Sequence, residues 1–169
     1  MKKKPAKTIA QYGCMLAFAM IVSYVEAILP INIGIPGAKL GLANVAIVYC
    51  MYMFGGGPAF GVNFLRILLT GLLFGSPYSM LYSFAGAAFS FGVMVLLKQA
   101  KNFSIIGVSI AGGVMHNVGQ LLLAFAITKV TVLFGYLSVL CVIGALTGLV
   151  NGFLAKTIIQ KTKNISTEK

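Results

Sequence analysis

Charged residues are almost absent from the long central part of this chain. Positions 8–157 hold only seven of them, and apolar runs of roughly membrane-spanning length lie between. Only 9% of the 169 residues are charged and 59% are hydrophobic, whereas an ordinary soluble domain has roughly 25% charged residues. A water-soluble fold of this size needs more polar surface than these residues supply. The composition therefore indicates a helical integral membrane protein.

Six apolar segments account for nearly the whole sequence. We predict spans over about 8–29, 39–54, 58–74, 77–97, 104–128 and 131–157, with Gly, Pro and polar residues in the breaks between them. A spanning helix takes roughly 20 apolar residues, so the second segment is short for this purpose. We expect an all-α integral membrane protein: a bundle of six transmembrane helices that forms a single domain over 1–169.

Basic residues are distributed unequally between the two sides of such a bundle. Ten of the thirteen fall on the side that carries both termini, whereas Lys39 and Lys129 fall on the other side and Arg66 lies inside a span. Basic residues next to spanning helices mark the cytoplasmic face. We therefore predict both termini in the cytoplasm, in a bacterial cell membrane. Anionic lipid head groups account for the net charge of +11, so no nucleic-acid partner is indicated.

Small residues recur at helical spacing on the first and the sixth segment. Gly144, Gly148 and Gly152 repeat every four residues on the sixth, and Gly13 and Ala17 do so on the first. Such stripes let two helix backbones approach closely within lipid. For the sixth segment we expect packing inside the bundle. For the first, the stripe could serve internal packing or the docking of another membrane protein.

Strongly polar side chains at membrane depth are few, and each needs a physical reason. They are the candidate substrate-binding residues: Glu26, Lys39, Asn44, Asn63, Arg66, His116, Asn117, Gln120 and Asn151. An Arg at the bilayer centre costs roughly 2.5–3.5 kcal/mol even on the lenient insertion scale. Helical spacing places Asn63 with Arg66 on one face and His116 with Gln120 on another. We expect both faces to point into the bundle.

Two interpretations of these polar residues remain open. They could bond to one another in a dry core, with Glu26 paired to Arg66. Alternatively, they could line a water-filled pocket in the outer half of the membrane. Lys39, Arg66 and His116 would there meet an anionic group, and Glu26 would meet a cationic group or clamp Arg66. The loop after the first span would then act as a lid, because its prolines stiffen it and its glycines permit turns. The lid residues are Pro30, Asn32, Gly34, Pro36 and Gly37.

Catalytic motifs are missing from the chain. It contains no Asp, so it cannot form the Asp-rich magnesium sites with which prenyl-transferring enzymes hold a diphosphate. It has no Gly-rich phosphate loop followed by Lys and Ser or Thr. His116 has no Ser or Cys partner at a recognisable spacing. The sequence indicates no catalytic residue, metal site or cofactor, and an independent enzyme is not expected.

Several segments together resemble a known family. They are residues 36–44 (PGAKLGLAN), 116–120 (HNVGQ) and 147–152 (TGLVNG), with Glu26, Pro30 and Arg66. The pattern resembles the Gx transporter family, also labelled heptaprenyl diphosphate synthase component I. This family is similar to the S components of energy-coupling-factor transporters.

The resemblance implies a fold, a ligand and partners. It implies six helices with cytoplasmic termini and a small solute, isoprenoid- or quinone-related, bound near the outer face under the loop after helix one. It also implies an energising module, namely a membrane T component with two ATPases, that would dock at Gly13 and Ala17. S components usually carry two Ala at this spacing, so Gly13 departs from the pattern.

Three functions are therefore weighed. The first is an S-component-like subunit that binds and takes up a solute, and the second is a non-catalytic membrane subunit of a polyprenyl diphosphate synthase. The third is a small transporter that works alone as an oligomer. Co-purification with ATPases, co-purification with an Asp-rich synthase subunit, or transport by the chain alone in liposomes separates them.

Overall fold

The computed structural model describes residues 5–28 and 41–167, and the described part is helical throughout apart from its connections. Six α-helices and one 3-10 helix follow in order: α1 (Pro5–Ile28), α2 (Asn44–Met53), α3 (Gly56–Phe74), α4 (Pro77–Gln99), α5 (Ile105–Thr128), η1 (Thr131–Tyr136) and α6 (Leu137–Thr167). With η1 and α6 taken together, the described residues form six stretches of helix, and five of them are long and apolar enough to cross a membrane. The prediction of an all-α membrane bundle is confirmed.

The second helix corrects the predicted spans. A helix over 39–54 was expected, but α2 has only ten residues, Asn44–Met53. At 1.5 Å per residue it is about 15 Å long, roughly half of the hydrocarbon core of a bilayer. Helix geometry cannot continue back through Gly41, whose φ of +82° is accessible mainly to glycine. One full span is thus replaced by a short internal helix.

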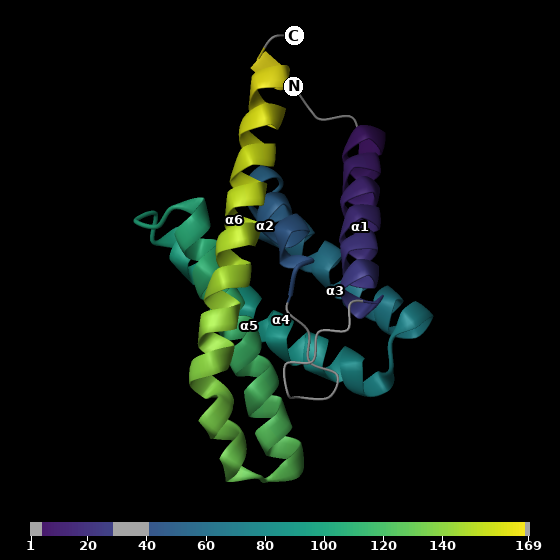
Figure 1. Cartoon of the computed structure of the whole chain (residues 1–169). Helices are drawn as coiled ribbons and strands as arrows, with labels where there is room; N and C mark the ends of the chain where they lie inside the picture. The colour runs from purple at the N-terminus through teal and green to yellow at the C-terminus, as the bar shows by residue number, and fades with distance from the viewer. Residues whose placement is uncertain (1–4, 29–40, 168–169) are drawn as a thin grey trace.

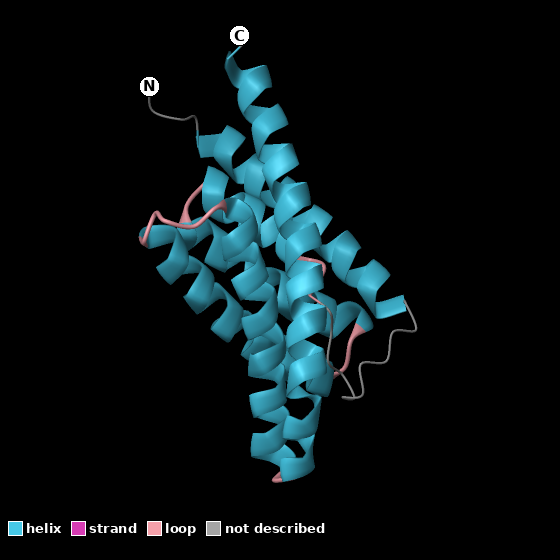
Figure 2. Cartoon of the chain, turned by 60° about the vertical axis from the view of Figure 1, so that its left-hand side comes forward, coloured by secondary structure: helices cyan, strands magenta, loops and turns pink. Residues whose placement is uncertain are grey.

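The sixth helix also differs from its predicted bounds. The predicted span 131–157 begins with η1, and α6 then runs from Leu137 to Thr167, ten residues past the predicted end. Figures 1 and 2 show the start of α1 and the end of α6 at one end of the molecule, with the α5–η1 turn at the opposite end. The helices α1, α3, α4 and α5 agree with the predicted spans to within about three residues at each end.

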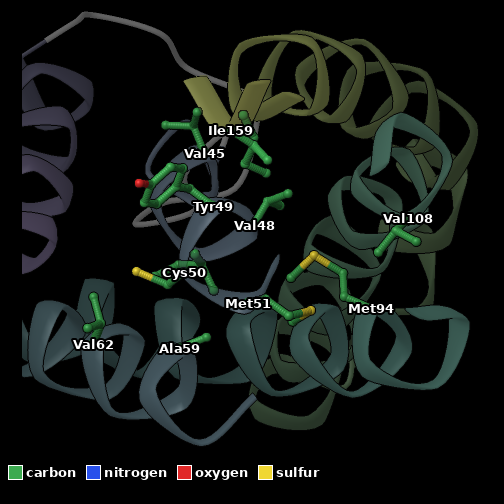
Figure 3. Close-up of a cluster of buried hydrophobic side chains, with 12 residues drawn as sticks. Val45, Val48, Tyr49, Cys50, Met51, Ala59, Val62, Met94, Val108 and Ile159 are labelled. Atoms are coloured by element: carbon green, nitrogen blue, oxygen red, sulfur yellow. The ribbon is translucent and has the colours of Figure 1, made fainter. Parts of the chain in front are cut away.

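The short helix α2 lies at the centre of the bundle. It contacts α1, α3, α5 and α6, and each of its residues from Asn44 to Met51 is buried. Figure 3 shows Val48 and Met51 of this helix beside Met94 of α4, in one apolar cluster that α3, α5 and α6 complete. Because lipid covers the outer surface, this interior is defined by close packing and polar contacts rather than by exclusion from water alone.

Glycines bring α5 and α6 into direct backbone contact. A Cβ added to Gly144 would lie 2.6 Å from the carbonyl oxygen of Gly113, and one added to Gly148 would lie 2.6 Å from that of Ser109. A Cβ on Gly152 would lie 2.9 Å from Cα of Ile106. The expectation that the small residues of the sixth segment serve packing inside the bundle is confirmed. The resulting α5–α6 hairpin forms one wall of the site described next.

Candidate functional site

Gly41 is the point at which three helices meet through hydrogen bonds. Its N–H donates to Oε1 of Glu26 in α1 over 2.6 Å. Its carbonyl oxygen accepts from Nδ2 of Asn151 in α6 at 3.0 Å, and from the backbone N–H of Asn44 in α2 at 3.0 Å. Glu26, Asn44 and Asn151 are all buried. A single backbone unit therefore joins α1, α2 and α6.

A side chain at position 41 would disturb this arrangement. A Cβ there would lie 3.2 Å from Nδ2 of Asn44 and 3.3 Å from Cδ2 of His116. The positive φ adds backbone strain for any residue other than glycine. The absence of a side chain at Gly41 therefore lets His116 of α5 pack against the residue that is hydrogen-bonded to Glu26 of α1 and Asn151 of α6.

His116 is enclosed on two sides by glycine. Its ring faces Gly41 on one side, and a Cβ added to Gly86 of α4 would lie 2.8 Å from its Nδ1. The Nε2 atom lies 3.0 Å from Nε2 of Gln120, as the spacing of four residues predicts. With the amide nitrogen as donor, Nε2 of the ring is the acceptor of this contact. His116 and Gln120 are 2% and 1% exposed, so both belong to the interior of the bundle.

Arg66 forms a second group of polar contacts beside the first. Its Nη1 donates to Oγ of Ser23 at 3.1 Å, and its Nη2 donates to Oδ1 of Asn63 at 2.8 Å. The guanidinium also lies within electrostatic range of the Glu26 carboxylate. The side chain is 4% exposed, and its Nε has no hydrogen-bond partner within the described chain. Arg66 thus keeps unused donor capacity inside the membrane.

The predicted site residues separate into three groups. The first group surrounds Gly41: Glu26, Asn44, His116, Gln120 and Asn151. The second group is Asn63 with Arg66, on the shared face that their spacing predicted. Asn117 points elsewhere, because its Nδ2 donates to the carbonyl of Leu140 in α6 at 2.7 Å. Lys39 and the predicted lid residues, Pro30, Asn32, Gly34, Pro36 and Gly37, lie outside the described residues.

Three residues of this site were not selected from the sequence. Gly41 stands inside the segment 36–44 and within the predicted second span, where it is not distinguished from other glycines of an apolar run. Ser23 shares a helical face with Glu26 at a spacing of three residues, but this spacing alone does not indicate its contact with Arg66. Nothing in the sequence marks Gly86 as a site residue, because only the fold shows that the ring of His116 packs where a side chain at position 86 would lie.

The two predicted docking residues lie on the outer face of α1. Gly13 and Ala17 are both exposed, and nothing lies within 4 Å of a Cβ built on Gly13. Ala17 borders an apolar groove of about 420 Å³ that Tyr24 of α1 and Phe74 of α3 also line. The first stripe of small residues therefore faces outward, unlike the stripe on α6.

The chain matches the family model described as heptaprenyl diphosphate synthase component I over residues 15–158. The chain belongs to this family. The match includes both polar groups described above, from Ser23 to Asn151, and also Ala17, whereas Gly13 lies before it. No curated protein and no solved structure matches the chain. The structure shows this member of the family as a bundle of several membrane-length helices whose interior contains buried polar side chains.

Proposed function

We propose that this component I protein is a membrane-embedded, S-component-like subunit that binds a small solute for uptake by an energy-coupling-factor-type transporter. The observation that carries the proposal is the hydrogen bond between Gly41 and Glu26. It joins α1 to the region that precedes α2, next to the buried polar side chains around Gly41. This bond holds together the two described residues that flank the connection from α1 to α2, which is where the proposed lid is attached.

The charges of the site favour a solute with an anionic group. Arg66 uses Nη1 and Nη2 on the neutral acceptors Ser23 and Asn63, and its Nε is left over in the described chain. A buried guanidinium is well suited to an anionic oxygen, because its planar fork of donors matches two oxygens at once. The apolar surroundings suit a solute that also has a hydrocarbon part, such as an isoprenoid- or quinone-related molecule.

The outward face of α1 fits the partner that such a subunit requires. Gly13 and Ala17 allow another helix to approach at backbone distance, as the T component of an energising module with two ATPases would. We expect Leu at both positions to leave solute binding intact and to abolish assembly with that module. Leu at Gly61 is the matched control, because its Cβ position is equally open and lies on α3. Pull-down of the ATPases by the tagged variants measures the difference.

The binding site itself is tested through Arg66. The purified protein is analysed by native mass spectrometry for a small molecule that stays bound. We expect such a molecule in the unmodified chain, and its loss in Arg66→Leu while helical content in detergent is retained. Ser23→Ala is the control for loss of one neutral contact, and we expect it to weaken binding without abolishing it. Normal retention by Arg66→Leu would assign the Arg to structure alone.

The family description favours a second candidate function. A component I implies a further component, and the name identifies a heptaprenyl diphosphate synthase. In this case the chain would be the non-catalytic membrane subunit that holds a soluble, Asp-rich synthase subunit at the bilayer. Co-expression with such a subunit and co-purification from membranes tests this. Retention of the synthase by the Gly13→Leu/Ala17→Leu variant, together with no association of ATPases with the unmodified chain, would favour it.

A further inference from the structure

A groove between α3 and α4 opens toward the surrounding lipid. Its volume is about 460 Å³. Phenylalanines form its walls: Phe60 of α3 meets Phe91 of α4 with ring centroids 5.7 Å apart, and Phe64 meets Phe84 at 5.5 Å. Phe60 and Phe64 are 58% and 46% exposed. The groove therefore offers an aromatic surface that a hydrocarbon chain can reach from the bilayer.

One polar side chain lines this groove, and it leads to the buried Arg. Among the lining residues only Asn63 is polar, and its Oδ1 accepts the hydrogen bond from Nη2 of Arg66. Asn63 thus separates the groove from a guanidinium that is 4% exposed and whose Nε has no partner in the described chain. The apolar groove and a buried cation with one spare donor, Nε, therefore lie on the two sides of one amide.

The position of these residues along α3 gives the groove a direction. Arg66 lies near the middle of α3, whereas Phe60 lies within its first two turns. Phe91 lies toward the last two turns of the antiparallel α4. A molecule with its charged group at Arg66 would therefore extend its hydrocarbon chain toward the end of the bundle that carries the α2–α3 and α4–α5 turns. Its head would point toward the base of the loop between α1 and α2.

We infer that the groove holds the hydrocarbon chain of a single-chain phosphate amphiphile, whose anionic head binds Arg66 in place of Asn63. The inference rests on the proposed function and names its solute class and its route, which is lateral entry from the bilayer. Charge complementarity selects the anionic head. The volume falls in the lower half of the range for small-molecule sites, which suits one chain rather than the two chains of a phospholipid. Asn63 is the positioning residue: its Oδ1 accepts a hydrogen bond from Nη2 of Arg66 while no anionic head group is bound.

The test compares two leucine substitutions that place the same side chain on different faces. A Cβ on Gly92 of α4 meets nothing within 4 Å, and this residue lines the groove, so Gly92→Leu fills the groove without a clash. Gly61 of α3 is equally open and does not line the groove. The full chain is placed in phosphatidylcholine nanodiscs, and binding of farnesyl phosphate is measured. We expect Gly92→Leu to lower the affinity for farnesyl phosphate by about tenfold, because about two carbons of the hydrocarbon chain lose their contacts. Gly61→Leu should bind as the unmodified chain does.

Further ligands separate the head from the chain. Inorganic phosphate should bind weakly and equally to both leucine variants, and farnesol should compete poorly. Phosphatidylglycerol in excess should not displace farnesyl phosphate. Displacement by phosphatidylglycerol would make the groove an ordinary lipid contact and would overturn the inference. Equal affinity of Gly92→Leu and the unmodified chain would do so as well.

The inference and the proposed function can fail separately. A bound solute that depends on Arg66 but is insensitive to Gly92→Leu would retain the function and overturn the groove. The opposite result, farnesyl phosphate binding that is sensitive to Gly92→Leu in a chain that recruits no ATPases, would support the groove. The S-component role would then fail on its own.

Discussion

Glu26 and Gly41 are joined by a hydrogen bond of 2.6 Å, in which the backbone N–H of Gly41 donates to Oε1 of the carboxylate. The residues are fifteen positions apart, and they stand at the two ends of the connection from α1 to α2. The same carboxylate acts electrostatically on Arg66. One acidic side chain therefore fixes the start of the central helix and balances the buried cation. Each of these two roles leads to a prediction.

Replacing Gly41 by Ala should destabilise the protein, whereas the same change at Gly13 should not. The positive φ of Gly41, +82°, gives any other residue backbone strain of about 1–2 kcal/mol. The new Cβ at Gly41 would also press on His116 and Asn44, whereas Gly13 lies inside α1 and has open space. We expect Gly41→Ala to cost about 2–3 kcal/mol in total, measured by thermal unfolding in detergent. An unchanged unfolding temperature for Gly41→Ala would show that the backbone and the polar group both accommodate a methyl.

Removing the charge of Glu26 should distinguish its two roles. Glu26→Gln keeps an oxygen for the N–H of Gly41 and removes the charge near Arg66, whereas Glu26→Leu removes both. Loss of one member of a buried charge pair costs about 3–5 kcal/mol, and we expect Glu26→Leu to approach this range. Glu26→Gln should retain part of the stability. The order would be contradicted if Gln and Leu lowered the unfolding temperature equally.

Much of the fold could be predicted because membrane helices obey strong constraints. Apolar runs fixed α1, α3, α4 and α5 closely, since each must satisfy its backbone hydrogen bonds internally within lipid. The pairs Asn63–Arg66 and His116–Gln120 followed from helical spacing alone, and both are hydrogen-bonded in the structure. Local periodicity was sufficient wherever the partners lie on one helix.

Contacts between helices could not be predicted in the same way. The break at Gly41 looks like any other glycine in an apolar run, so α2 was predicted too long. Asn117 and Asn151 are both amides in spans, yet Asn117 bonds to Leu140 and Asn151 bonds to Gly41. The direction of each follows from how α5 and α6 are rotated against each other. Glycine contacts between those helices fix this rotation, and sequence spacing does not specify them.

The orientation of the bundle is predicted from its charges. Among the described residues, Lys7 lies in the first turn of α1, Lys156 and Lys161 lie in the second half of α6, and Lys129 is the C-cap of α5. Figure 1 shows the start of α1 and the end of α6 at one end of the molecule and the α5–η1 turn at the opposite end. Basic residues are retained on the cytoplasmic side. An alkaline phosphatase fusion at either end of the chain should therefore be inactive, and a green fluorescent protein fusion should be fluorescent. An active phosphatase at one end only would exclude this topology.

The last prediction concerns the other end of the central helix. Isolated helices shorter than about 12–15 residues are marginal in water even for good helix formers. We therefore expect α2, with ten residues, to depend on contacts at both of its ends. Lys98 of α4 donates a hydrogen bond from Nζ to the carbonyl of Met51, and the ammonium lies 5.0 Å from the centre of the Tyr52 ring. A cation near the last carbonyls of a helix also interacts favourably with the helix dipole.

Replacing Lys98 by Met keeps the apolar stem and removes both the donor and the charge. We expect a loss of about 1–3 kcal/mol, the range for leaving a part-buried acceptor without its partner. Lys101→Met is the matched control, because Lys101 lies in the same turn and its side chain is exposed. Thermal unfolding in detergent gives the stability, and hydrogen exchange of the α2 amides gives the local effect. Faster exchange in α2 for Lys98→Met but not for Lys101→Met is the expected result, since Lys98 donates a hydrogen bond to the carbonyl of Met51 and the side chain of Lys101 is exposed. If both variants exchange alike, α2 is held by its N-terminal contacts at Gly41 and by the apolar cluster around it, without a contribution from Lys98.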